Sequence, residues 1–259
     1  MVINEMRRSC SMRVVQISGG AVFCVVSMAA ADILTVPGDF PTIQSAIDAS
    51  SSGDHVMVSP GVFNELIDFS GKAITVEGSG SGTSTIDGAG LSGSVVRFAS
   101  EEGSGSVLAN FRVCHGSGEF VTDPVFGNVK CGGGILVRSG SPIIHDCVID
   151  SNDTWGGAGM CNVSASPTVS DCSFRSNVSE GHGGGIYNLN GSEPLIERCS
   201  FESNTASWGG GITNTVGSDA VKAPVDCPSA SSRGWSDGIP MIDSADEPSP
   251  DFLCSRCDG

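Results

Sequence analysis

The sequence predicts an all-β chain that folds as a single-stranded, right-handed parallel β-helix, a solenoid with coils of about 25 residues. Three nearly identical segments between residues 141 and 204 carry this prediction: SPIIHDCVIDSN, SPTVSDCSFRSN and EPLIERCSFESN. Their equivalent residues follow one another at intervals of 25 and then 27 residues. A second series, GGGI, GAGM, GGGI and GGGI, begins at residues 132, 157, 183 and 209. Repeats of this length are typical of solenoids, in which each unit buries its apolar face against its neighbours.

Short apolar runs with a period of two predict β-strands within each repeat and argue against helices. In the first repeat the alternating apolar positions are Ile144, Cys147 and Ile149. Glycine, serine and asparagine separate the runs, as expected for bends between strands. Three short strands in each unit predict one triangular turn of a β-helix, with equivalent strands about 4.8 Å apart in parallel sheets.

Identical residues at equivalent positions predict ladders that run along the solenoid. Stacked asparagine amides can hydrogen bond from one coil to the next, which satisfies polar groups at a buried bend. A free cysteine behaves as a small hydrophobe, so a buried row of thiols is favoured over a disulfide or a metal site. The predicted ladders are Asn152, Asn177 and Asn204; Asn162, Asn188 and Asn214; and Cys147, Cys172 and Cys199.

Residues 1–31 have the layout of a secretory signal peptide. Three arginines precede an apolar run from Val14 that ends in small residues before Asp32. A membrane anchor is the alternative interpretation, although polar residues and glycines interrupt the run. The signal predicts a secreted or cell-surface protein, extracellular or periplasmic, with no stable membrane span after cleavage.

The β-helix is predicted over residues 32–216. Ile43, Ala46 and Ile47 have helical spacing in the segment 41–50, and we expect a short helix there to cap the open end of the first coil. Residues 119–129 are interpreted as a loop inserted in one coil.

No repeat is recognisable beyond Val216. Residues 217–259 are rich in acids, serine and proline, and this composition predicts a disordered tail. The last coil would then lack a cap, and exposed sheet edges would favour end-to-end self-association.

The formal net charge is −16, from 29 acidic and 13 basic side chains. Such a surface repels nucleic acids and anionic lipids, so nucleic acid is excluded as a partner. Solubility is one interpretation of the excess acids, and binding of a divalent cation such as calcium is the other. No other cofactor is predicted.

Two resemblances follow from these segments. Residues 36–78, from VPGDFPTIQ to AITVEG, resemble the opening of secreted right-handed parallel β-helix proteins of the pectate-lyase-like superfamily, pectin methylesterases included. The GGGI motifs, with FRSN (174–177) and FESN (201–204), are similar to the repeats of bacterial polymorphic outer-membrane proteins. The resemblance covers about residues 33–216 and implies the β-helix fold, with a polysaccharide or the cell envelope as a partner. It does not imply one activity, because this fold also carries lyases, esterases, hydrolases and non-enzymatic surface proteins.

Two motifs resemble parts of catalytic sites. GVFNE (61–65) resembles the G-x-Y-x-E motif of pectin methylesterases, but the aspartate pair and arginine of that family have no matching segment, and a turn with Phe63 entering the core is favoured. GHG (181–183) resembles a histidine motif of polygalacturonases. His182 is nevertheless equivalent to Trp208, Gly156 and Cys131 in the repeat, which indicates a variable corner residue.

The best candidate binding site is a polar cluster on adjacent coils. Asp146, Asp171 and Arg198 form one row, and His145, Ser170 and Glu197 form the neighbouring row. Carboxylates can bind calcium through oxygen atoms, and a nearby base is what a lyase requires. Acids beside a turn are also commonly solvated surface. Trp155 and Trp208, near the glycine corner, could stack on sugar rings or cover the corner.

Two functions remain open from the sequence. The first is a secreted or cell-surface β-helix without catalysis, serving as an adhesin-like or envelope scaffold or as a passive carbohydrate binder. The second is a polysaccharide-active enzyme of lyase, esterase or hydrolase type, with its site on the outer face near residues 145–202. No complete catalytic constellation is recognisable in the sequence, which favours the first.

Overall fold

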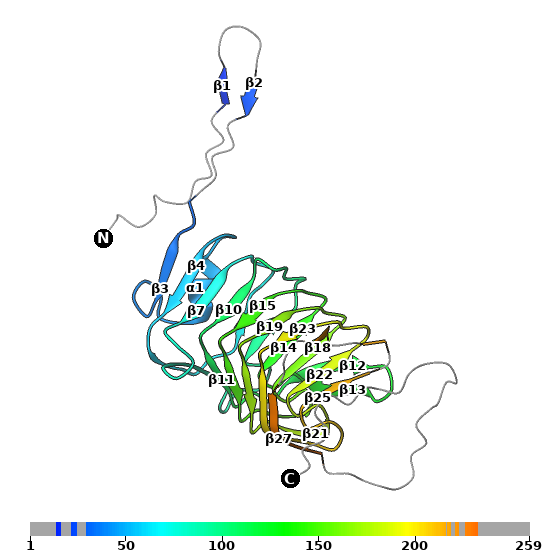
Figure 1. Ribbon diagram of the computed structural model, residues 1–259. Coiled ribbons are helices and arrows are strands. Elements are labelled where there is room, and N and C mark those ends of the chain that lie inside the picture. The colour runs from blue at the N-terminus through cyan, green and yellow to red at the C-terminus, as the bar shows by residue number, and fades with distance from the viewer. Residues whose placement is uncertain are drawn as a thin grey trace.

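The protein is a parallel β-solenoid of about seven turns, with ~26 residues in each coil and one short helix near the N-terminus (Figure 1). The computed structural model describes residues 30–215 and 217–218 in full. Residues 14–16, 22–24, 221–222 and 226–232 are described by strand pairing alone. The predicted fold class is therefore confirmed, including the helix at the N-terminal end.

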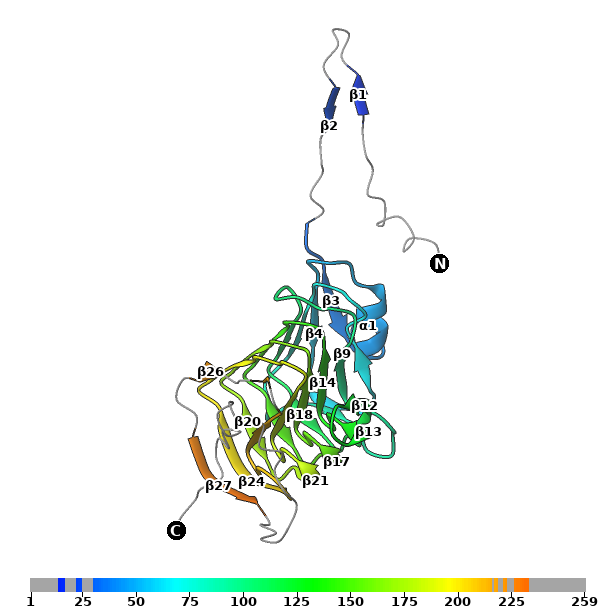
Figure 2. The ribbon, with the colours of Figure 1, turned by 90° about the vertical axis from the view of Figure 1, so that its right-hand side faces the viewer.

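Three sheets run along the solenoid, and equivalent strands of successive coils pair in parallel (Figure 2). The first sheet consists of β3 (Ile33–Val36), β4 (His55–Val58), β7 (Thr75–Gly78), β10 (Val107–Ala109), β15 (Ile143–His145), β19 (Thr168–Ser170), β23 (Leu195–Glu197) and β26 (Val221–Lys222). The third consists of β6 (Ile67–Asp68), β9 (Val96–Phe98), β14 (Ile135–Arg138), β18 (Met160–Val163), β22 (Ile186–Leu189) and β25 (Ile212–Asn214).

The second sheet bends, because each of its later coils contributes two consecutive strand segments. One part consists of β5 (Gly61–Phe63), β8 (Ser84–Asp87), β11 (Arg112–Cys114), β16 (Val148–Asp150), β20 (Ser173–Arg175), β24 (Ser200–Ala206) and β27 (Asp226–Ser232). The other part continues from β24 through β21 (Val178–His182), β17 (Asp153–Gly156), β13 (Gly127–Cys131) and β12 (Glu119–Asp123). The long strand β24 therefore joins the two parts.

Residues in the left-handed region mark the corners of the coils. Between the first and second sheets, Asp146, Asp171 and Arg198 have φ values of 54°, 54° and 51°. Aspartate tolerates this region better than most non-glycine residues do. The corner before the third sheet has glycine in each of four repeats, with φ between 54° and 66°: Gly132, Gly157, Gly183 and Gly209. The repeated glycine motifs thus encode one corner, and the polar cluster occupies another.

Apolar side chains fill the interior of the coils. Most strands of the three sheets contribute inward residues to one continuous core, including the stacked rings of Phe174 and Phe201, whose centroids are 5.0 Å apart. Cys147, Cys172 and Cys199 lie in this core and are almost completely buried. Burial raises the pKa of the Cys172 thiol well above its usual value, which keeps it neutral.

The asparagines form two amide ladders. The Asn152 Nδ2 donates to Asn177 Oδ1 over 3.0 Å, and the Asn177 Nδ2 donates to Asn204 Oδ1 over 2.9 Å. Each of these amides also donates to a backbone carbonyl of the preceding coil. The second ladder runs through Asn162, Asn188 and Asn214, with Nδ2 to Oδ1 distances of 2.8 and 2.7 Å.

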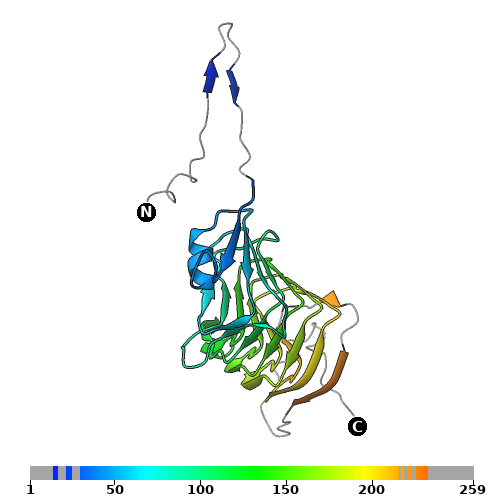
Figure 3. The ribbon, with the colours of Figure 1, turned by 90° about the vertical axis from the view of Figure 1, so that its left-hand side faces the viewer.

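The helix α1 (Ile43–Ala49) closes the first coil (Figure 3). Thr42 is its N-cap, and Ile43, Ala46 and Ile47 are its buried residues, the three that the helical spacing predicted. The Glu65 carboxylate accepts hydrogen bonds from two backbone N–H groups of its first turn, at 2.9 Å each. An anionic side chain at this end is stabilising, because the N–H groups there have no partner within the helix.

The predicted loop at residues 119–129 is a β-hairpin of β12 and β13, which pair antiparallel. Val121 and Val129 pack over the outer face of the third sheet, and this contact forms a second, smaller core. The Tyr187 hydroxyl lies inside it and donates to Asp123 Oδ2 over 2.7 Å. The segment is an insertion as predicted, but alternating apolar residues on both sides of its turn make it a hairpin and not a loop.

The two ends of the chain are only partly described. Most of the predicted signal peptide, residues 1–31, lies outside the described residues; within it, β1 (Val14–Gln16) and β2 (Val22–Cys24) pair antiparallel. In the predicted tail, residues 217–259, the strands β26 and β27 pair in parallel with β23 and β24, and most of the remainder lies outside the described residues. Among the described helices, none has the length and apolar character to cross a membrane.

Candidate functional site

A groove of about 510 Å³ follows the corner between the first and second sheets. Corner residues of successive coils and a glycine-rich loop, residues 80–82, line it. The lining residues are Gly80, Ser81, Gly82, Asn110, Asp146, Cys147, Val148, Asp171, Cys172, Ser173, Arg198 and Ser200. The groove therefore spans several coils and is lined mainly by small and polar side chains.

The structure brings the six predicted site residues together. His145, Ser170 and Glu197 are Cα partners on β15, β19 and β23, one residue before the corner. Asp146, Asp171 and Arg198 are the corner residues themselves, and these three line the groove. The left-handed backbone turns the chain at this point, so the corner side chains face outward from the coil. The repeat spacing alone was sufficient to predict this arrangement.

The charged groups of the cluster are paired with one another. Arg198 binds Asp171 through two hydrogen bonds of 2.7 Å each, from Nε and Nη2, and its Nη1 lies 3.3 Å from Glu197 Oε2. The hydrogen bonds from Arg198 hold the pKa of Asp171 below its usual value. Asp171 therefore stays ionised at neutral pH and has no proton to donate.

His145 contacts the remaining carboxylate of the cluster. Its Nδ1 lies 2.8 Å from Asp146 Oδ2. Calcium bound between Asp146 and Asp171 would have to compete with both His145 and Arg198 for these carboxylates. The cluster is consequently better arranged to donate and accept hydrogen bonds than to hold a metal ion.

Other groove residues were not predicted as site residues. Asn110 is the corner residue of an earlier coil, with φ 63°, and its Nδ2 donates to Glu77 Oε1 over 3.0 Å. Ser173 and Ser200 are paired on β20 and β24. Their equivalence to one another was visible in the repeat, but nothing in the sequence indicated that this row borders a groove.

An aromatic cluster covers the glycine corner on another side of the solenoid. The ring of His182 stacks on Trp208, with centroids 4.7 Å apart, and it also contacts Trp155 and Phe126. Both ring nitrogens of His182 are buried without a hydrogen-bond partner. Burial lowers the pKa of His182 to about 4, so its ring is neutral at pH 7. His182 is thus a packed corner residue in this arrangement.

The two tryptophans of this cluster have different surroundings. Trp155 is half-buried and contacts the rings of Phe126, His182 and Tyr187, so it packs over the corner. Trp208 is 39% exposed and leaves part of its ring open to solvent. The GVFNE motif has a structural role: Phe63 packs against the core, and Glu65 caps α1.

Comparisons with known proteins found one family of repeats and several solved structures to which this chain is similar. The Chlamydia polymorphic membrane protein repeat matches residues 171–189. A pectin methylesterase in complex with a hexasaccharide is 12% identical and has a TM-score of 0.51, covering 76% of this chain and 68% of its own. Pectin methylesterases from carrot and from Aspergillus niger are 12% and 15% identical, with TM-scores of 0.41 and 0.39. They cover 80% and 85% of this chain and 86% and 88% of their own chains.

The structural likeness at 12% identity establishes a shared β-helix fold and no activity. No curated protein matches the chain. The matched repeat is described as that of a polymorphic membrane protein, and the match covers residues 171–189 alone. The resemblance in fold predicted from residues 36–78 and from the repeats is therefore confirmed.

Proposed function

We propose that this chain is a secreted or cell-surface β-helix protein that binds a neutral saccharide chain in the corner groove and performs no chemistry on it. The observation that carries the proposal is the groove of about 510 Å³, to which coil after coil contributes a polar side chain. Successive coils are about 4.8 Å apart, so these donors and acceptors recur at regular intervals. A saccharide chain likewise presents its hydroxyl groups at regular intervals.

The charges favour a neutral ligand. Asp146 and Asp171 line the groove, Glu197 lies beside it, and the nearby Arg198 is already bound to Asp171. The chain as a whole has a formal net charge of −16. A polyuronate would be repelled by this surface, whereas uncharged hydroxyl groups can hydrogen bond with the carboxylates.

The ion pairs also favour binding without catalysis. A general acid needs a proton at the working pH, and Asp171 is held ionised by Arg198. The surface location fits the polymorphic membrane protein repeat, and the saccharide ligand fits a fold that a hexasaccharide-bound esterase shares. An envelope scaffold would use the same groove as its contact with neighbouring glycans.

Calorimetric titration with neutral hexasaccharides, cellohexaose and mannohexaose, tests the proposal, with hexagalacturonate as the anionic comparison. We expect at least one neutral sugar to bind more tightly than hexagalacturonate. Ser173→Trp, which fills the groove, should weaken that binding at least tenfold. Glu202→Trp places the same ring on an exposed position of the same sheet and should not. Absence of neutral binding, stronger binding of hexagalacturonate, or full binding by Ser173→Trp would each overturn the proposal.

One observation favours the alternative, a polysaccharide-active enzyme. The carboxylate of Asp146 holds His145 by Nδ1, and this arrangement can leave the other ring nitrogen to act as a base. Incubation with pectin, with and without calcium, would detect unsaturated product or methanol. An activity that His145→Gln abolishes would establish this alternative and contradict a passive role. An activity unchanged by Asp146→Ala with Asp171→Ala would place the reaction outside this cluster.

A further inference from the structure

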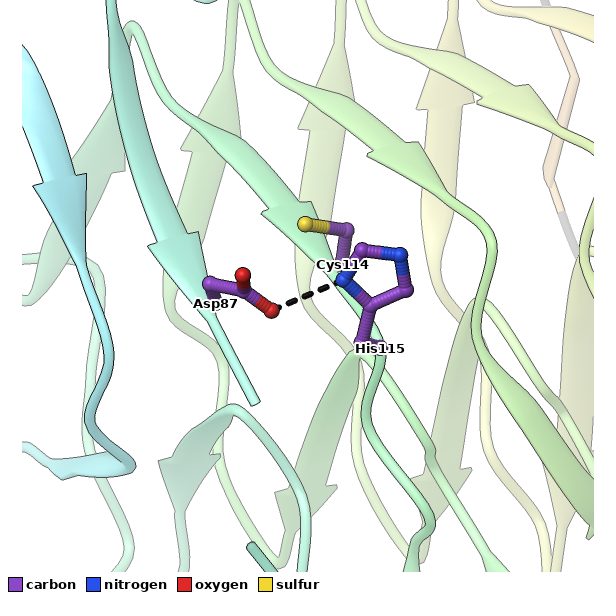
Figure 4. A group of neighbouring side chains, drawn as sticks. All are labelled: Asp87, Cys114 and His115. Atoms are coloured by element: carbon purple, nitrogen blue, oxygen red, sulfur yellow. Dashed lines mark hydrogen bonds and ion pairs between the residues drawn. The ribbon is translucent and has the colours of Figure 1, made fainter. Parts of the chain in front are cut away.

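Three side chains with metal-binding atoms meet on the second sheet, away from the groove. Asp87 ends β8, Cys114 ends β11, and the two are Cα partners on adjacent coils. His115 follows Cys114 at a corner, with φ 59°, and its Nδ1 lies 2.8 Å from Asp87 Oδ1. One ligand atom from each residue lies within 4.8 Å of the other two (Figure 4).

Cys114 differs from the cysteines of the interior row. Its neighbour Val113 points into the core, so the alternation of the strand turns Cys114 outward, in the row of Asp87 and Asp150. The side chain is nevertheless fully buried, and its thiol lies 3.9 Å from the Ile86 carbonyl and interacts with the Asp87 side chain. Packing of the apolar core therefore does not account for a thiol at this position.

The nearest charged pair, Arg112 and Asp150, does not neutralise the charge of Asp87. Arg112 binds Asp150 through two hydrogen bonds of 2.7 and 2.9 Å, so its positive charge is balanced locally. A divalent ion bound by the Asp87 carboxylate and the Cys114 thiolate would form a site without net charge, because a neutral His115 adds none. The sheet holds β8 and β11 side by side, so the backbone positions of Asp87 and Cys114 are fixed before the ion arrives.

We propose that Asp87, Cys114 and His115 bind one zinc ion, or a similar divalent transition metal, with a fourth position open to water. Thiolate, imidazole and carboxylate are the ligand types that zinc takes in proteins, at about 2.0–2.3 Å. On binding, the ion would displace the thiol proton of Cys114 to solvent and take the place of the hydrogen bond between His115 Nδ1 and Asp87. The three ligand atoms would have to draw together by side-chain rotation. Three protein ligands and one open position is an arrangement that zinc also has in catalytic sites.

Cobalt(II) is the probe for the test, because a thiolate ligand gives it a charge-transfer absorption in the near ultraviolet. The background is the full chain with Cys227, Cys254 and Cys257 changed to serine, which removes the other candidate thiols of the C-terminal segment. We expect one equivalent of CoCl₂ to produce the band and ZnCl₂ to displace it. Asp87→Asn and His115→Gln should each weaken binding more than tenfold, and Cys114→Ser should remove the band.

The control variant is His55→Gln, which removes a histidine that also pairs with a carboxylate, Glu77 at 2.8 Å. Its affinity for cobalt should be unchanged. Circular dichroism identifies any variant that fails to fold. If Cys114→Ser fails to fold, the cobalt affinities of Asp87→Asn and His115→Gln decide the test. Binding without a charge-transfer band, or equal affinity in folded Asp87→Asn and His115→Gln, would overturn the proposal.

Discussion

Asn177 is the residue whose contacts best explain why the repeat keeps an asparagine at this bend. Its Oδ1 accepts from the backbone N–H and from the side-chain Nδ2 of Asn152. Its own Nδ2 donates to the Ile149 carbonyl and to Asn204 Oδ1. All four partners belong to neighbouring coils, so one amide joins three turns of the solenoid.

Replacing Asn177 by alanine should therefore destabilise the fold strongly. The change leaves several buried polar groups without partners, at about 1–3 kcal/mol each, so we expect a loss of about 3–5 kcal/mol in the free energy of unfolding. Denaturation in urea measures it. Asn128→Ala, at an exposed position of β13, is the control and should cost less than about 1 kcal/mol. Equal effects in the two variants would contradict the ladder as a source of stability.

His182 makes the stability depend on pH. Its pKa falls from 6.5 to about 4 on folding, because burial among aromatic rings disfavours the charged ring. The native state thus binds this proton more weakly than the unfolded chain does. The stabilising contribution is complete above pH 6.5 and is lost as the pH falls from 6.5 towards 4.

Between pH 7 and pH 4.5 this loss should amount to about 2 kcal/mol. Urea denaturation of the protein and of His182→Phe at both pH values measures it, because phenylalanine keeps a ring in the cluster but does not titrate. On going from pH 7 to pH 4.5, the free energy of unfolding should fall by about 2 kcal/mol more in the unchanged protein than in His182→Phe. An equal pH dependence in both would mean that His182 is accessible to solvent.

At the scale of the elements, the capping helix depends on a residue from another coil. Glu65 lies more than twenty residues after the start of α1, yet its carboxylate accepts from the backbone N–H groups of Ile43 and Gln44. The helix spans only seven residues, too few to be stable alone. Its three buried side chains and this carboxylate attach it to the first coil.

We expect Glu65→Ala to destabilise the N-terminal end by about 1–2 kcal/mol, as for the loss of an N-cap. Glu65→Gln retains an acceptor without the charge and should cost less. Amide hydrogen exchange should show faster exchange in α1 and the first coil of Glu65→Ala and unchanged exchange in β20. Unchanged exchange in α1 would indicate that apolar packing alone holds the helix.

The sequence of residues 119–129 predicted an insertion but not the hairpin of β12 and β13 that it forms. Residues 119–129 break the repeat, which is why an insertion was predictable. Tertiary contacts hold the two strands together: Val121 and Val129 pack on the third sheet, and the Tyr187 hydroxyl donates a hydrogen bond to Asp123. These contacts join residues 64 positions apart, and no local pattern encodes them.

For the whole molecule, stability comes from stacking similar coils. Each coil buries its apolar residues against the next, and two amide ladders and parallel sheets repeat the same contacts along the axis. Parallel strands β26 and β27 continue two sheets beyond residue 216. End-to-end association of the solenoid stays a prediction, as do the cleaved signal peptide and the boundary of the tail.

The sequence alone determined the period, the strands of the regular repeats, the glycine corner and the juxtaposition of Asp146, Asp171 and Arg198, because in a solenoid residues one repeat apart become spatial neighbours. Only the tertiary structure decided what these neighbours do. Side-chain directions and coils of unequal length decide four features: the pairing of Arg198 with Asp171, the groove beside them, the capping role of Glu65, and the meeting of Asp87 with Cys114 and His115. A regular repeat specifies which residues are adjacent, but irregular coils and individual side chains specify the contacts.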